Sequence, residues 1–220
     1  WTDGVDIARV LFSDGEDIAK NIIEIFRGQS NKRNLSTQIY LDTDDENIDL
    51  DKYISFANSI NPNIISFPKS VGIDTFSGLK GKINTNIKIS LRLKASDSLT
   101  DLEDYYDHCS YVMIESSSQD IVDNKLVENA KLKNVEPIYL AKMPTLMKGQ
   151  VQSRDENFEI GHTLEEGFDI VALYEETAQG PYPARSVKCI DEIAVESEKL
   201  RVNPFADLLE KIMSIFKRKT

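Results

Sequence analysis

The chain has 220 residues, of which 37 are acidic and 26 are basic, and its formal net charge is −11. A chain of this length can bury one substantial core, so a single domain is the simplest expectation. The negative charge opposes contact with nucleic acid phosphates and anionic lipid surfaces. No run of about eighteen apolar residues is present, so we expect neither a nucleic acid partner nor a membrane span.

The two cysteines, Cys109 and Cys189, are too few to suggest a disulfide framework. They favour a reducing intracellular compartment: the cytoplasm, or an organelle such as the mitochondrion if a targeting peptide has been removed. The sequence begins at Trp1 without a methionine, which is typical of a processed or partial chain.

The first half of the chain alternates apolar runs with segments of helical spacing. Apolar runs at 5–12, 38–41, 63–70 and 86–94 predict strands. After the first run, Ser13 and Glu16 have the spacing of a capping box, and we expect the helix that follows to end at Gly28. The next two helices are indicated by apolar side chains at helical intervals: Leu50, Tyr53, Ile54 and Ala57, and then Ile73, Phe76 and Leu79.

The second half continues the same alternation. Strands are predicted at 110–118, 136–142 and 170–173, with a helix carrying Leu126, Val127 and Ala130 after the first of them. The last strand is followed by a tight loop and by a helix that begins at Pro183. Proline is tolerated at the first helical position because the N–H that it lacks would have no intrahelical partner there. Strands alternating with helices in this way are typical of a parallel β/α array.

The loop at 176–183 reads Glu-Thr-Ala-Gln-Gly-Pro-Tyr-Pro, which resembles the signature G-E-T-A-x-G-x-Y-P of the pyruvate kinase family. Earlier segments resemble that family's strands in the same order over about 200 residues. The resemblance implies an α/β fold, a TIM-type (β/α)8 barrel over residues 1–200, with an amphipathic helix and basic tail at 201–220. The family's first strand would precede Trp1, and its lid and carboxyl-terminal domains have no counterpart here.

The resemblance also implies a remnant phosphate and potassium pocket. Arg9 and Ser13 match a phosphate-contacting arginine and a cation-binding serine, whereas Leu11 replaces the asparagine that binds the cation. Asp42 and Thr43 match the residues that complete the potassium site. The plainer interpretation is that these four residues make structural hydrogen bonds, with Ser13 as a helix cap.

Other positions of the family's catalytic machinery have changed. The catalytic lysine corresponds to Arg92, and the two magnesium-binding carboxylates correspond to Lys94 and Ser118. The catalytic threonine corresponds to Lys142. Because Mg²⁺ prefers carboxylate oxygens, a lysine at this position cannot serve as its ligand.

Several other polar groups have simple explanations. His108 and His162 are far apart and lack cysteine or carboxylate neighbours at ligand spacing. The serines at 116–118 are expected in a polar turn, and the acidic residues at 42–46 lack the glycine and final glutamate of a calcium loop. The terminal helix, with Phe205, Leu208, Leu209, Ile212 and Phe216 on one face, either binds a partner or covers the barrel.

We therefore expect a catalytically inactive, pyruvate-kinase-like barrel that acts as a structural or interaction subunit of a larger assembly. Its partner contacts are expected at the helix from Phe205 to Phe216 and at the gap left by the first strand. It should need no cofactor. The alternatives are an active pyruvate kinase, which would require Mg²⁺ and K⁺, and a sensor that retains part of the phosphate or nucleotide pocket.

Overall fold

A computed structural model describes residues 5–94, 97, 100–115 and 124–202 of the chain. The fold separates into two compact units. Unit 1 comprises Trp1–Ala141 and Phe168–Ala172, and unit 2 comprises Lys142–Gly167 and Leu173–Thr220. The two units are described separately below.

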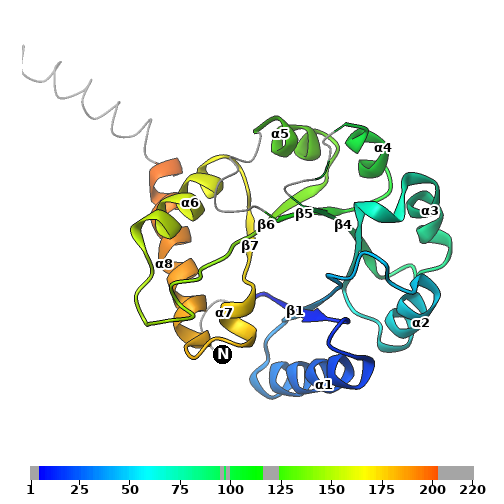
Figure 1. Cartoon of the computed structure of the whole chain (residues 1–220), viewed down its shortest axis with the longest axis horizontal. Helices are drawn as coiled ribbons and strands as arrows, with labels where there is room; N and C mark the ends of the chain where they lie inside the picture. Colours follow the sequence, from blue (N-terminus) through cyan, green and yellow to red (C-terminus); the bar gives the residue numbers. More distant parts are fainter. Residues whose placement is uncertain (1–4, 95–96, 98–99, 116–123, 203–220) are drawn as a thin grey trace, which may run out of the picture. The chain divides into compact units, whose positions relative to one another are not determined.

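Unit 1 is built on a parallel sheet of seven strands whose spatial order follows the sequence. The sheet curls into a nearly closed barrel (Figure 1). Neither β1 nor β7 has a second neighbour among the described strands. The strands are β1 (Ile7–Leu11), β2 (Gln38–Asp42), β3 (Ile64–Pro68), β4 (Lys88–Lys94), β5 (Tyr111–Glu115), β6 (Glu136–Leu140) and β7 (Ile170–Ala172).

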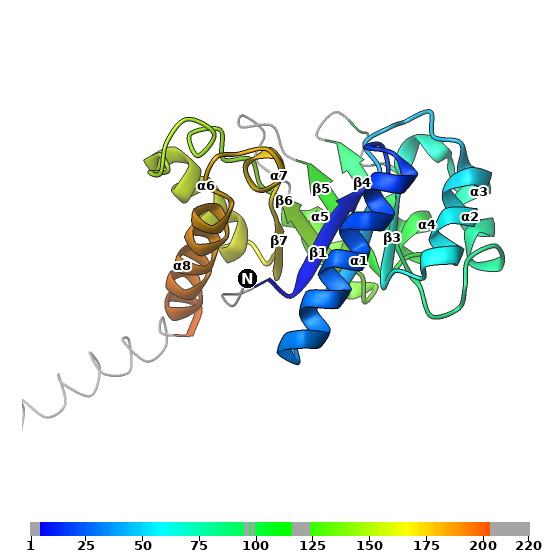
Figure 2. The ribbon, with the colours of Figure 1, turned by 90° about the horizontal axis from the view of Figure 1, so that it is seen from below.

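The helices of unit 1 lie on the outer side of this sheet (Figures 1 and 2). Each connects one parallel strand to the next, as the geometry of parallel pairing requires. The α-helices are α1 (Glu16–Arg33), α2 (Leu50–Ile60), α3 (Ile73–Gly78), α4 (Leu102–Tyr106) and α5 (Asn124–Leu132), and 3-10 turns form at η1 (Lys69–Val71) and η2 (Leu79–Gly81).

Both expected ends of the first helix are wrong. Its N-cap is Gly15 and no side chain caps it, so Ser13 has no capping role. The helix also continues through Gly28 to Arg33, where Asn34 adopts the left-handed conformation with φ of 53°. A single glycine costs a helix only about 1 kcal/mol, and the residues that follow it form another helical turn.

The core of unit 1 contains a row of aromatic rings between the sheet and the first helices. Tyr53 of α2 lies 4.9 Å from Phe12 and 5.5 Å from Phe67 of β3, measured between ring centroids. Phe67 in turn contacts Phe76 of α3, and Phe76 contacts Tyr105 of α4. Edge-to-face aromatic pairs add to the free energy gained from burying their area. This row therefore ties four successive β/α connections to one another.

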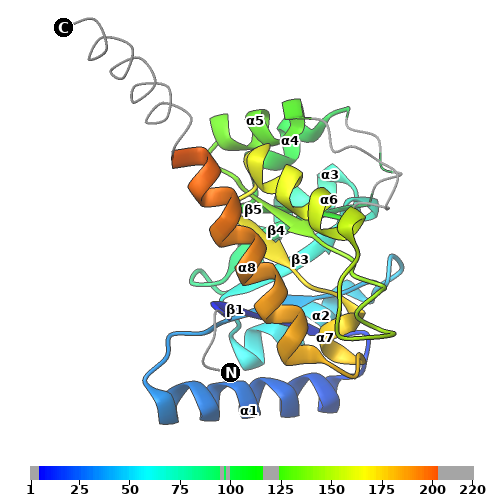
Figure 3. The same cartoon turned by 90° about the vertical axis from the view of Figure 1, so that its left-hand side faces the viewer.

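Unit 2 contains the helices α6 (Arg154–Glu165), α7 (Glu175–Ala178) and α8 (Pro183–Val202). Figure 3 shows α8 running alongside α6, and Gly161 of α6 faces Ile193 and Ser197 of α8. A capping box begins α6: Ser153 Oγ accepts from the Glu156 backbone N–H at 3.1 Å, and Glu156 Oε2 accepts from the Ser153 N–H at 2.8 Å.

The loop predicted at 176–183 is partly a short helix, α7. Gly180 follows it and donates its backbone N–H to Glu175 O at 3.0 Å. A Cβ atom at position 180 would lie 2.3 Å from Glu176 O, so only glycine fits there. The Glu-Thr-Ala-x-Gly part of this sequence is thus explained by the close turn that ends α7.

The structure confirms a parallel α/β fold in which seven strands nearly close a barrel. A complete TIM-type barrel, and a single domain over 1–200, remain predictions. The expected helix from Phe205 to Phe216 and Ser118 lie outside the described residues. Within the described part of the chain, no helix combines the length and the apolar character needed to cross a membrane.

The buried row of rings leads to a test of core stability. We expect Phe67→Ala to lower the free energy of unfolding by about 3–5 kcal/mol, because it removes a fully buried ring between two others. Phe158, which is 75% exposed, is the matched control, and Phe158→Ala should change that free energy by no more than about 0.5 kcal/mol. Urea unfolding of both variants measures the difference, and equal effects would contradict the assignment of Phe67 to the core.

Candidate functional site

The most concentrated set of buried charges in unit 1 lies at the carboxyl ends of the strands, where parallel α/β folds usually place their binding sites. Asp42, the last residue of β2, is fully buried. Its Oδ2 atom accepts from Arg9 Nε at 2.7 Å and lies 2.6 Å from Arg9 Nη2. Because β1 and β2 pair in parallel, Arg9 and Asp42 are two positions apart along the sheet, within reach of one another.

The second oxygen of Asp42 is also satisfied. Oδ1 accepts from the Thr43 backbone N–H at 2.8 Å and from the hydroxyl of Ser66 on β3. Thr43 then directs its carbonyl oxygen to Arg92 of β4, which donates a hydrogen bond to it through Nη1. Arg92 Nη2 lies 3.0 Å from Glu115 Oε2 on β5. The contacts thus run from β1 to β5.

Each charge in this cluster is favoured by the opposite charges around it. Burial alone would raise the pKa of Asp42, but attraction to Arg9 and Arg92 and the hydrogen bond from Ser66 outweigh burial and lower it. Burial would likewise lower the pKa of Arg92, whereas Asp42 and Glu115 raise it. Asp42 and Arg92 are therefore both favoured in their charged forms, and each lies next to a side chain of opposite charge.

A second ion pair lies at the rim of the same strand ends. Lys94, the last residue of β4, places Nζ 2.5 Å from Glu46 Oε1. The hydrogen bond from Lys94 to Glu46 is the main reason that the pKa of Lys94 is raised, so the ammonium remains protonated. Both side chains are partly exposed, and the pair therefore contributes little to stability.

The structure brings together four of the predicted site residues: Arg9, Asp42, Thr43 and Arg92. Ser13 is exposed and makes no hydrogen bond to them within the described part of the chain. Lys142 belongs to unit 2, where its Nζ lies 5.5 Å from the centroid of the Tyr174 ring.

Sequence reasoning missed the groups that complete the cluster. Ser66 is a hydroxyl in the middle of an otherwise apolar strand, Glu115 is the last residue of β5, and Glu46 belongs to the acidic segment 42–46 that follows β2. The available signal was the register of the parallel strands, since Lys94 pairs with Glu115 and thereby places Arg92 near that carboxylate. Register is not readable from composition, so these partners appear only in the folded chain.

The chemistry that this arrangement can perform is limited by its internal pairs. Among the described residues, no group of three or more histidine, cysteine, aspartate or glutamate side chains is placed to hold a metal ion. The guanidinium of Arg92 is directed at protein acceptors through Nη1 and Nη2. Its Nε is buried and makes no hydrogen bond within the part of the chain that the structure describes.

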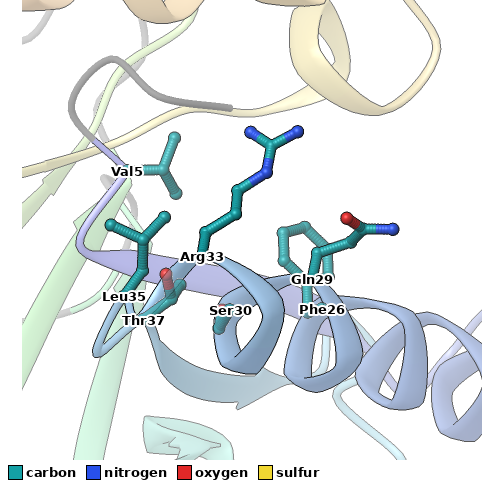
Figure 4. Close-up of a pocket in the computed structure, with 7 residues that line it drawn as sticks. All are labelled: Val5, Phe26, Gln29, Ser30, Arg33, Leu35 and Thr37. Atoms are coloured by element: carbon teal, nitrogen blue, oxygen red, sulfur yellow. The ribbon is translucent and has the colours of Figure 1, made fainter.

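A small surface pocket lies at the other end of the strands (Figure 4). It lies between the last turns of α1 and the residues that lead into β1 and β2, and Arg33 is the one ionisable side chain among those that line it. Without acids, bases or nucleophiles facing one another, this pocket offers no catalytic arrangement. The strand ends around Asp42 remain the candidate site.

Comparison with known proteins gives a distant similarity. The chain is 23% identical over 142 residues to Pyruvate kinase 2 of Synechocystis sp., a match that covers 60% of this chain and 24% of that protein. No family model matches the chain. The chain is thus distantly similar to a pyruvate kinase and spans about a quarter of its relative's length.

The buried ion pair predicts a large loss of stability when its acid is neutralised. We expect Asp42→Asn to lower the free energy of unfolding by about 3–5 kcal/mol at pH 7, because Arg9 would keep a buried charge without its counterion. Asp51, whose side chain is 93% exposed and pairs with Lys82 at 3.8 Å, provides the control. Asp51→Asn should have an effect below about 1 kcal/mol in the same urea titration.

The same variant has a predicted pH dependence. Since the pKa of Asp42 is lowered from 3.8, its charge stabilises the fold at higher pH, and this contribution is lost as pH falls below that value. The stability difference between the native chain and Asp42→Asn should therefore narrow in acid. A difference that stays constant or grows between pH 7 and pH 3 would contradict this ionisation.

Proposed function

We propose that this chain is a catalytically inactive, pyruvate-kinase-like barrel that serves as a structural or interaction subunit of a larger assembly. The observation that carries the proposal is the engagement of Lys94 by Glu46 at the strand ends. The resemblance to the family implies that a metal-binding carboxylate is replaced by Lys94. An ammonium group has only donors and carries a positive charge, so it would repel a divalent cation there.

The state of Arg92 supports the same proposal. The resemblance to the family implies that Arg92 replaces a catalytic lysine. Here the guanidinium is 3% exposed and is directed at the Thr43 carbonyl and the Glu115 carboxylate. Phosphoryl transfer depends on cations that face the transferred group and neutralise its developing charge. A cation already neutralised by the protein can supply little of that stabilisation.

The folded scaffold of the chain also supports the proposal. The seven parallel strands retain a buried apolar core, and their ends are linked by charges that require no ligand. A folded barrel whose strand-end charges are neutralised by one another can still bind other proteins through its outer surface. This supports a role in protein binding and not in catalysis.

The proposal predicts catalytic silence. Purified chain supplied with Mg²⁺, K⁺, ADP and phosphoenolpyruvate should form no pyruvate above the background without protein, while an active pyruvate kinase in the same buffer serves as the positive control. Turnover that disappears in Arg92→Ala would restore the enzyme alternative. Turnover that persists in Arg92→Ala would point to a contaminating enzyme.

One observation favours a second candidate, a phosphate or nucleotide sensor. Arg92 Nε is a buried donor without an acceptor in the described structure, and Arg9 lies on the same side of the sheet. An anion entering the strand ends could accept from Arg92. It would have to do so next to the buried carboxylate of Asp42, which makes binding weak.

Calorimetry separates the two candidates. We expect no heat of binding from inorganic phosphate or ADP at millimolar concentration if the cluster is purely structural. Binding that is abolished by Arg92→Gln, while Arg27→Gln leaves it intact, would establish the sensor. Arg27 is a matched control because it is an exposed arginine of α1 that donates to the Asn61 carbonyl.

A further inference from the structure

The exposed face of helix α6 in unit 2 carries a pair of stacked aromatic rings. Phe158 is 75% exposed, whereas the other phenylalanines and the tyrosines of the described residues are buried or half-buried. Its ring centroid lies 5.9 Å from that of the His162 imidazole, with 18° between the two planes. Nε2 of His162 lies 3.3 Å from Oε1 of Glu166, so a carboxylate also orients the imidazole. The ring of Phe158 is thus held in a defined orientation at the surface of the chain.

Phe158 lies on the side of α6 that the core of unit 2 does not use. The buried residues of this helix include Ile160, Thr163 and Leu164, and Gly161 faces α8. At 3.6 residues per turn, the direction of Phe158 differs from the directions of the three buried side chains by about 120–160°. The exposure of this ring is therefore a property of the outer face of the helix and not a defect of core packing.

Acidic side chains flank the two rings on the same face. Asp155 precedes Phe158 by just under one turn, Glu165 follows His162 by just under one turn, and both are exposed. Neither carboxylate forms an ion pair within the described part of the chain. Arg154 is the one lysine or arginine of this helix. We call the four residues Asp155, Phe158, His162 and Glu165 the aromatic face of α6, and its charge favours a positively charged ligand.

We propose that the aromatic face of α6 binds a basic segment of another protein through an arginine of that segment. His162 stacks on one side of the Phe158 ring, which leaves the other side for a guanidinium group. Asp155 and Glu165 supply the carboxylates with which the basic segment pairs. This inference rests on the interaction role proposed above, and it names the chemistry of the partner.

An arginine suits this face better than a lysine does. The guanidinium group is planar, so it can stack on an aromatic ring while its N–H groups point outward to carboxylates. It is also less strongly hydrated than an ammonium group, and therefore loses less when it leaves water. The proposal thus predicts a preference for arginine over lysine, and a requirement for positive charge in addition to planar shape.

The charge disfavours a second copy of this chain as the occupant. Each copy has a formal net charge of −11. A symmetric contact through this face would bring Asp155 and Glu165 of one copy close to the same residues of the other. Like charges placed together in this way oppose association, whereas a basic partner meets no such repulsion.

Titration of the full chain with a short arginine peptide, followed by NMR, tests the proposal. The chain has two histidines, and His108 belongs to unit 1, so it is the internal control for His162. We expect acetyl-Gly-Arg-Gly-Arg-Gly-amide to give a saturable shift of the His162 imidazole resonances and no shift of those of His108. The matching lysine peptide should bind about fivefold more weakly. The citrulline peptide, which is planar but uncharged, should give no saturable shift.

Variants of the chain assign the binding to this face. Phe158→Ala should weaken binding of the arginine peptide about tenfold, and Phe158→Tyr should retain it. Because Phe158 is exposed, neither change should disturb the fold. Glu165→Gln should weaken binding about threefold. Glu103→Gln, which changes an exposed glutamate of unit 1, is the matched control and should leave binding unchanged.

A shift that His108 shares, that persists in Phe158→Ala, or that the citrulline peptide produces equally would overturn the proposal. The absence of a saturable shift would also overturn it, including the case in which another part of this chain already covers the face. A His162 shift that grows with the concentration of the chain alone would assign the face to a second copy and contradict the proposal. None of these measurements involves pyruvate formation, so their failure is distinct from a failure of the predicted catalytic silence.

Discussion

The buried carboxylate of Asp42 is the constraint on which the arrangement of the strand ends depends. A charge without solvent must be matched by counterions and hydrogen-bond donors, and Asp42 takes these from β1, from β3 and from its own loop. The backbone bond to Thr43 directs the next carbonyl toward Arg92, which brings Glu115 into the network. A change at one position therefore leaves a neighbour unsatisfied, and the cluster is held as a unit.

This interdependence bears on the proposed role. A site that binds an anion or a metal keeps charges available for the ligand, and it does so at a cost in stability. In this chain two cations at the strand ends are paired with carboxylates of the protein: Arg92 with Glu115, and Lys94 with Glu46. Stability requires these charges to be paired within the protein, whereas catalysis requires them to face a ligand. The pairing of Arg92, which is 3% exposed, with Glu115 favours stability, in agreement with the structural role proposed above.

The positions of the strands could be predicted from the sequence, whereas the side-chain contacts that depend on strand register could not. Short apolar runs between turns identified all seven strands, because a strand buried on both faces has few other compositions. The end of α1 was misplaced because Gly28 is only a weak interruption, whereas Asn34 in the left-handed conformation is a firm one. The partners Ser66 and Glu115 could not be chosen beforehand, because each becomes a neighbour only when strands align.

The order of the strands has a consequence for how the protein forms. Every strand pairs only with its neighbours in sequence, and no described ladder joins the first strand to the last. Each pairing therefore closes a loop that contains one strand–helix connection and no more, which limits the entropy lost at each step. The sheet can grow by one strand and one helix at a time as the chain leaves the ribosome. A sheet with this strand order can begin to fold from β1 and β2 before β7 has been synthesised.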